Sequence, residues 1–324
     1  MAISRKDIAA HLERMVRTGF LLGSKTFTPM RSAFVREVTS DGSFEDYADM
    51  GNVPWPVQNA GKQGAGGLHG ETGAVKVGLS NEGRSIRIVG GNERAVRVYN
   101  VDYEIAVGIF HNAIDDDRAG DLEGWARGAA VNFERHKDYL SFSALNSGDG
   151  ATYGNGYDNL TFFNNAHIDP GAEYQTGQDN LFALALSLNN FETVKVASAK
   201  FLDDRGQPIG FNHNLLIVPP DLERIAAQIS ANREDYATAD RSINPYAGSV
   251  RHLVAPGGWL DTSAWFVIDT SMPEKPVNLQ NRKNPELIIW DDETQGGGGV
   301  RYFKWHARYQ VFYGDWRLAV MGNT

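Results

Sequence analysis

The sequence predicts an α+β protein built from a few helices and scattered antiparallel strands. Apolar residues recur with helical spacing in several segments, of which residues 115–146 are the longest. Other short segments are continuously apolar or alternate polar and apolar residues, as residues 265–269 and 93–99 do, which is typical of strands. No internal repeat is visible, so these elements do not form a repeat array.

Composition excludes several classes of protein. A chain of 324 residues allows one large domain or two to three modules. No apolar run is long enough to span a bilayer, so we expect no membrane-embedded segment. No export signal is visible at the N-terminus, so we expect the chain to work in a cytosol. The absence of cysteine excludes disulfide scaffolds, iron–sulfur clusters, thiolate zinc sites and cysteine nucleophiles.

Charge is distributed unevenly along the chain. The net charge is −9, which disfavours a nucleic-acid grip over the whole chain. Residues 1–36 nevertheless hold seven Lys or Arg residues against two acidic ones. Such a basic segment can dock on the acidic surface of a neighbouring subunit or lie near a polyanion, and it can equally be a solvated helix.

The N-terminal segment predicts an amphipathic helix followed by an arm. One apolar stripe is formed by Ile8, Leu12, Met15, Val16 and Phe20. We expect Gly19 or Gly23 to end this helix. From residue 25 to residue 57 no period is sustained, and Pro54 and Pro56 favour an extended path. This segment is therefore interpreted as an arm without a packed core.

Residues 58–112 predict an excursion that has no core of its own. Residues 59–73 contain six glycines, and two strands are expected at 85–89 and 93–99 with Gly90, Gly91 and Asn92 as the turn between them. Residues 101–110 continue the strand pattern. Because nothing in this segment offsets the entropy of ordering it, we expect it to be disordered in isolated subunits and to become ordered on a neighbour.

The longest predicted helix covers residues 115–146. Three aspartates at 115–117 favour its N-terminus through the helix dipole. Its apolar face includes Leu122, Trp125 and Phe133. Three glycines, Gly120, Gly124 and Gly128, form a smooth strip where another backbone could approach closely.

The remaining segments alternate between strands, helices and loops. We expect a helix at 190–202 with a capping box from Asn189 and Glu192, a buried strand at 215–218, and a helix opened by Asp221. Residues 240–258 are interpreted as an exposed loop. The end of the chain predicts a long hairpin with strands at 286–290 and 302–313, followed by a strand at 317–321.

No active site is recognisable. The glycine run at 61–67 lacks the Lys-Ser/Thr of a phosphate-binding loop, and no Gly-x-Ser-x-Gly elbow occurs. The histidines form no HExxH pair, and the acidic group of His111, Asp115 and Asp117 is better explained by a helix start than by a metal. We therefore expect no catalytic residue, no cofactor and no metal, which favours a structural role.

Motifs spread over residues 95–324 resemble the Mu-like phage major head subunit family, whose members are Hong Kong 97-type capsid proteins. The matching stretches, in order, are Ile114–Asp117 leading to Asn132–Asp138, Tyr157–Phe163 with Ala166–His167, Asp204–Pro208, Leu215–Glu223, Trp265–Asp269, Lys275–Pro276, Gln280–Leu287 and Tyr313–Ala319. Residues 1–90 share with the family only the order of segments, a helix and arm followed by a glycine-rich excursion.

The resemblance implies a division of the chain. It implies an N-terminal helix and arm at 1–57, an extended loop at 58–112, a peripheral domain with a long spine helix at 113–180, an axial domain at 181–285, and return strands of the peripheral domain at 286–324. It also implies that scaffolding, if needed, is a separate protein, since the N-terminus is short.

The implied function is that of a major capsid protein of a tailed double-stranded DNA phage or Mu-like prophage. It would self-assemble through pentamers and hexamers into an icosahedral head in the bacterial cytoplasm and reside in the virion. Expected partners are further copies of itself, portal and possibly decoration proteins, and weakly and non-specifically bound DNA, with no membrane. An encapsulin-like shell around protein cargo and a soluble enzyme are the alternatives. Candidate subunit contacts are Arg14, Arg17, Arg84, Arg87, Arg94 and Arg97.

Overall fold

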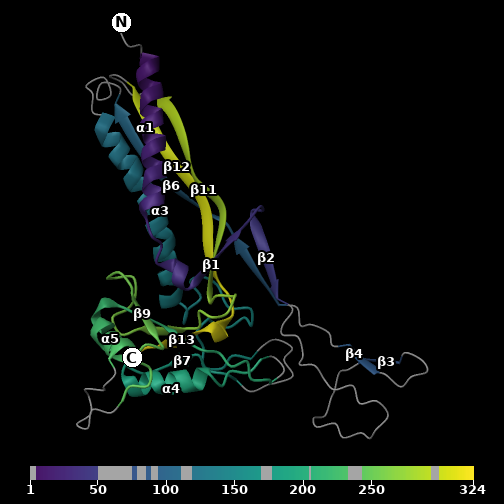
Figure 1. Cartoon of the computed structure of the whole chain (residues 1–324). Helices are drawn as coiled ribbons and strands as arrows, with labels where there is room; N and C mark the ends of the chain where they lie inside the picture. Colours follow the sequence, from purple (N-terminus) through teal and green to yellow (C-terminus); the bar gives the residue numbers. More distant parts are fainter. Residues whose placement is uncertain are drawn as a thin grey trace, which may run out of the picture.

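The protein is an elongated body with a long helix-covered sheet at one end and a smaller sheet at the other (Figure 1). This computed structural model describes residues 5–49, 75–78, 85–88, 94–110, 119–168, 177–203, 206–232, 243–292 and 299–324. No helix in these ranges is long and apolar enough to cross a membrane. The α+β class predicted from the sequence is confirmed.

The long sheet has four strands in the order β1-β11-β12-β6. Its strands are β1 (Val35–Thr39), β6 (Val101–Phe110), β11 (Val277–Asp292) and β12 (Val300–Tyr313). The strand β1 runs parallel to β11, and the other pairs are antiparallel. Alternate residues of β12, such as Phe303, Trp305 and Tyr309, are buried on the inner face of the sheet. The predicted C-terminal hairpin is thus present, with β6 added along its edge.

Two long helices lie side by side along this sheet (Figure 1). They are α1 (Arg5–Thr26) and α3 (Ala119–Asn146). The side chain of Phe20 in α1 stacks on Trp305 of the sheet with ring centroids 5.9 Å apart. The helices therefore cover the inner face of the sheet and complete the core at this end.

The expectation that Gly19 or Gly23 ends the first helix is wrong. The helix continues through both because they are its contact points with α3. A Cβ atom on Gly19 would lie 2.7 Å from the carbonyl oxygen of Glu123, and one on Gly23 would lie 2.5 Å from that of Arg127. Only glycine permits this approach. On α3 itself, a Cβ atom on Gly124 or Gly128 would meet open space, so these glycines are not the ones that α1 uses.

Part of the predicted arm belongs to the core. A 3-10 turn, η1 (Arg31–Ala33), precedes Phe34, which is fully buried, and β1 then pairs with β11. The interpretation of residues 25–57 as a coreless arm is therefore wrong for residues 31–39. A five-residue strand that pairs at a sheet edge is too short to show a period in the sequence.

The small sheet has five strands in the order β7-β13-β10-β8-β9. They are β7 (Leu181–Phe182), β8 (Leu215–Val218), β9 (Arg251–Val254), β10 (Trp265–Ile268) and β13 (Ala319–Gly322). All residues of β8, β10 and β13 are buried. The predicted apolar strands at 215–218 and 265–269 are thus confirmed.

Residues 319–322 pair with β10 in the small sheet after a 3-10 turn, η3 (Trp316–Leu318). The assignment of residues 286–324 to the peripheral domain remains a prediction.

Two expectations for this end are corrected. Residues 251–254, interpreted as loop, form β9 parallel to β8. The helix α4 (Leu188–Ser198) begins earlier than expected, because Ser187 caps it by accepting a hydrogen bond from the Asn190 backbone N–H. Another helix, α5 (Glu223–Ala231), follows η2 (Pro220–Leu222).

Two separate two-stranded ribbons complete the fold. One pairs β2 (Phe44–Asp49) with β5 (Arg94–Tyr99), and the other pairs β3 (Val75–Gly78) with β4 (Ser85–Ile88). The expected hairpin between residues 85–89 and 93–99 is therefore wrong, since these strands have different partners. Residues 89–93, which include the expected turn, lie outside the described residues.

Candidate subunit interface

The β2–β5 ribbon is held on the outer face of the long sheet. Tyr47 of β2 stacks on Phe312 of β12 with ring centroids 4.4 Å apart. At the base of the ribbon, the buried Asn100 donates hydrogen bonds to Ser40 Oγ (2.9 Å) and to the Gly42 carbonyl (3.0 Å), and it accepts one from Gln280 Nε2 (2.8 Å). Aromatic stacking and this amide network together fix where the ribbon leaves the body.

The ribbon corrects one expectation for the extended loop. Residues 94–110 were expected to be ordered only on a neighbour, yet β5 pairs with β2 and β6 pairs with β12 of the same chain. Residues 58–74, 79–84, 89–93 and 111–112 lie outside the described residues, so the expectation for them remains a prediction.

Arg97, a predicted subunit contact, has an acidic partner in its own chain. Its guanidinium contacts Asp46 across the ribbon at 2.6 Å and lies over the Phe44 ring at 4.5 Å. The hydrogen bond to Asp46 raises the pKa of Arg97 and lowers the pKa of the Asp46 carboxyl. Because both side chains are about half exposed, the pair is screened by water and adds little stability. Beside it, Phe44 and Tyr99 expose 40% and 60% of their surface.

The other predicted contacts fall into two groups. On α1, Arg14 is exposed, and Arg17 contacts Glu13 one helical turn away at 2.8 Å. Arg84 lies outside the described residues, whereas Arg87 and Arg94 are placed only by backbone pairing, opposite Lys76 and Asp49. Contact of these residues with another subunit remains a prediction.

The outer face of the long sheet carries paired charges near the ribbon and apolar side chains toward its far end. Lys304 contacts Glu104 at 2.6 Å, and Arg308 contacts Asp102 at 2.7 Å. Farther along, Phe110, Ile288 and Trp290 are exposed, and Trp290 stacks on Tyr302 at 5.0 Å. We call these last four residues the apolar end of the sheet.

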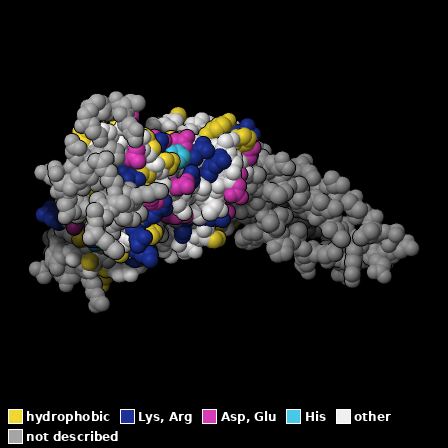
Figure 2. Space-filling view, turned by 90° about the horizontal axis from the view of Figure 1, so that it is seen from above, with side chains coloured by type: hydrophobic (Ala, Val, Ile, Leu, Met, Phe, Trp, Pro, Cys, Tyr) yellow, Lys and Arg dark blue, Asp and Glu magenta, His cyan; other side chains and the backbone are white. Residues whose placement is uncertain are grey.

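Charged side chains of both signs are interspersed on the described surface seen from above (Figure 2). No patch of a single sign stands out among the coloured residues there. Paired charges with interspersed apolar residues suit specific contact with another protein better than a general grip on phosphate.

A buried ion network, which was not predicted from the sequence, joins the N-terminal segment to α3. The Arg31 guanidinium, 3% exposed, contacts Glu134 (2.6 Å) and Asp138 (2.9 Å). Lys137 contacts Glu134 at 2.9 Å. Burial opposes the charge of Arg31, but its hydrogen bonds to Glu134 and Asp138 outweigh burial and raise its pKa. Glu134, Lys137 and Asp138 lie in the stretch 132–138 that carries the family resemblance, but their ion pairs were not predicted.

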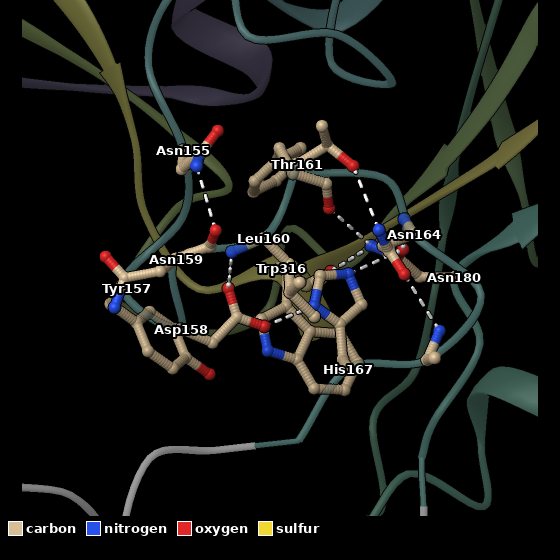
Figure 3. A network of polar contacts seen from close by, with 12 residues as sticks. Asn155, Tyr157, Asp158, Asn159, Leu160, Thr161, Asn164, His167, Asn180 and Trp316 are labelled. Atoms are coloured by element: carbon tan, nitrogen blue, oxygen red, sulfur yellow. Dashed lines mark hydrogen bonds and ion pairs between the residues drawn. The ribbon is translucent and has the colours of Figure 1, made fainter.

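A second buried network joins the loop after α3 to the C-terminal crossing between the two sheets (Figure 3). His167 Nδ1 lies 2.5 Å from Asp158 Oδ2, and its ring stacks on Trp316 at 4.2 Å. Asn180 donates to the carbonyls of Phe162, Trp316 and Ala319. We call His167, Asp158, Asn180 and Trp316 the histidine hub. Three of its members lie in or beside the motifs quoted above, and their polar role was not foreseen.

The described residues hold no group of three or more His, Asp or Glu side chains suited to a metal ion. His111, Asp115 and Asp117 lie outside them, so the sequence interpretation of that group stands as a prediction. The other buried histidine among the described residues is His213, which packs in the core. Burial lowers the pKa of His213 to about 4, and its Nε2 lies 3.2 Å from the Arg317 carbonyl oxygen.

Several solved structures with a similar fold are described as capsids or procapsids of bacteriophages. The chain resembles the procapsid protein of bacteriophage JBD30 (TM-score 0.52, 17% identity, 99% of this chain and 76% of that chain). It also resembles a chain of the JBD30 capsid decorated with minor capsid protein trimers (0.51, 20%, 73% and 92%) and one of Microbacterium phage Oxtober96 (0.51, 12%, 100% and 99%). The fold is therefore the Hong Kong 97-type capsid fold.

The model of the family described as "Phage capsid protein" matches residues 100–320, more than half of the chain. The chain belongs to this family, which consists of structural proteins of the phage capsid. No curated protein matches the chain.

Proposed function

We propose that this chain is the major head subunit of a tailed double-stranded DNA phage or Mu-like prophage. It assembles through pentamers and hexamers into an icosahedral shell around the genome, in the cytoplasm of the bacterial host. The observation that carries the proposal is the family match over residues 100–320 together with a fold shared along the whole chain with procapsid and capsid proteins. No described feature of the chain supports an enzyme.

The described surface supports assembly through several separate contacts. Large apolar side chains are exposed on α1 (Leu21, 60%), on α3 (Trp125, 55%), on the ribbon (Tyr99, 60%) and at the apolar end of the sheet (Phe110, 63%). A subunit that touches several neighbours needs apolar contact residues spread in this way rather than one large patch.

The proposal extends to partners. Scaffolding and portal proteins are separate chains, and packaged DNA is held weakly, because charges on the outer sheet face are already paired within the chain. A decoration protein is included because one similar structure is described as decorated with minor capsid protein trimers.

Electron microscopy of the purified protein and nuclease-protection analysis of its contents test the proposal. Closed shells that protect double-stranded DNA after production in the presence of packaging components support it. Shells that retain a defined protein cargo and never DNA would favour the encapsulin-like alternative.

A further inference from the structure

The histidine hub is enclosed from water and is fully hydrogen-bonded on both sides of the imidazole ring. The side chains of His167 and Asp158 are 0% exposed. Nδ1 of His167 lies 2.5 Å from Asp158 Oδ2, and Nε2 lies 3.0 Å from Asn180 Oδ1 (Figure 3). Each ring nitrogen therefore faces one oxygen atom.

The orientation of Asn180 decides which atom is the donor on the Nε2 side. Its Nδ2 amide group lies 3.0–3.2 Å from three backbone carbonyl oxygens, which can only accept. Its Oδ1 accepts the backbone N–H of Asn164 at 2.8 Å. The amide is thus fixed with its oxygen toward His167, and an amide oxygen cannot donate. Nε2 of His167 must carry a hydrogen.

The same reasoning applies on the Nδ1 side. If Nδ1 were bare, its lone pair would face a carboxylate oxygen at 2.5 Å, a contact that electrostatic repulsion would push apart. A hydrogen must therefore lie between Nδ1 and Oδ2. The hydrogen is placed on the nitrogen because the imidazole ring stacks on Trp316 with ring centroids 4.2 Å apart, and a cationic ring is favoured by such stacking.

We propose that His167 and Asp158 form a buried proton-binding site, in which His167 is an imidazolium that locks the loop after α3 to the chain crossing between the two sheets. The inference concerns the subunit itself and does not depend on shell assembly. Loss of the proton would leave the carboxylate unpaired in the core and loosen the junction at Trp316 and Ala319.

The other charged groups near His167 already have partners, so none of them balances the charge of its ring. On η3, Arg317 contacts Asp315 at 3.0 Å and Tyr157 Oη at 3.0 Å. Against the same turn, His213 is neutral near pH 7, because burial lowers its pKa. Asp158 Oδ1 accepts the Leu160 backbone N–H at 3.2 Å. The charge that balances His167 is therefore that of Asp158.

Nitrogen-15 NMR of the full-length, [15N]histidine-labelled protein at pH 7.5 tests the proposal directly. The two ring nitrogens of His167, assigned by loss of signal in His167→Gln, should both show the shifts and N–H couplings of an imidazolium. A bare ring nitrogen in the wild type would overturn the proposal, whatever happens to any variant.

An isosteric variant tests the role of Asp158. In Asp158→Asn the new amide N–H can donate to a neutral Nδ1, so the hub keeps its hydrogen bonds without the extra hydrogen. The same nitrogen-15 experiment on Asp158→Asn should therefore show one bare ring nitrogen, Nδ1, in His167. The control Asp179→Asn changes a nearby carboxylate that accepts the Leu181 backbone N–H, and its His167 should keep both N–H groups. Two N–H groups on His167 in Asp158→Asn would contradict the proposal.

Discussion

The contact between α1 and α3 predicts opposite effects for the same substitution at two glycines. In Gly23→Ala, the new Cβ would lie 2.5 Å from the Arg127 carbonyl oxygen and 3.0 Å from the Ala130 Cβ, so the helices must separate. Overpacking of this kind costs about 1–3 kcal/mol, and the higher helix propensity of alanine returns at most about 1 kcal/mol. We expect a net loss of about 1–2 kcal/mol.

Gly124→Ala is the matched control on the partner helix. Its Cβ would meet open space, so only the propensity gain of up to about 1 kcal/mol applies. Because this gain applies to both variants, they should differ by the overpacking cost of about 1–3 kcal/mol, which is roughly a 5- to 150-fold difference in the unfolding constant. Urea unfolding of dissociated full-length subunits, followed by circular dichroism, measures this as a shift in midpoint at constant slope. Equal stability of Gly23→Ala and Gly124→Ala would refute the close packing of α1 on α3.

Three further predictions address the buried charges, the acid response and the ribbon. Asp138→Ala should lower the free energy of unfolding by about 3 kcal/mol or more, because it removes a partner of the buried Arg31. Arg17→Ala, which breaks an exposed pair, should lower it by less than about 1 kcal/mol in the same unfolding assay. Equal losses in the two variants would contradict the argument from burial. Burial lowers the pKa of His213 to about 4, so the unfolded chain binds a proton at His213 before the folded chain does as pH falls below about 6.5. The free energy of unfolding should therefore fall by up to about 3 kcal/mol between pH 6.5 and pH 4. If His213→Phe showed the same dependence of stability on pH as the wild type, this explanation would be wrong. Tyr47→Ala should give folded subunits that form no shells, because the ribbon loses its aromatic stacking on β12. Tyr47→Phe should assemble normally, because the Tyr47 hydroxyl has no hydrogen-bond partner among the described residues. Shells of Tyr47→Ala on electron micrographs would refute this role of the ribbon.

Local patterns predicted the elements better than their partners. Continuous apolar runs identified β8 and β10 because both faces of these strands are buried. The strand β9 was missed because Arg251 and His252 are exposed, and its half-polar sequence is that of a loop. Pairing of β5 with β2 rather than with β4 depends on contacts between segments about fifty residues apart, which no local pattern records.

Glycines and buried polar residues were the hardest features to interpret. Glycine is common at the ends of helices, so Gly19 and Gly23 suggested a helix end. Only the position of α3 shows that they are contact points between two helices. Asp158 and His167 belong to stretches that carry the family resemblance, yet their chemistry depends on Asn180, 13 residues beyond His167, and on Trp316 near the C-terminus. In both cases the role of a residue is defined by its partner.

Cryo-electron microscopy of the purified full-length protein, with the mass of its particles measured in parallel, tests the central claim most directly. The account predicts closed icosahedral shells of pentamers and hexamers in which the four-stranded and five-stranded sheets of each subunit match the fold described here. A species that stays near the 35.7 kDa of one chain at all concentrations and salt conditions would contradict it.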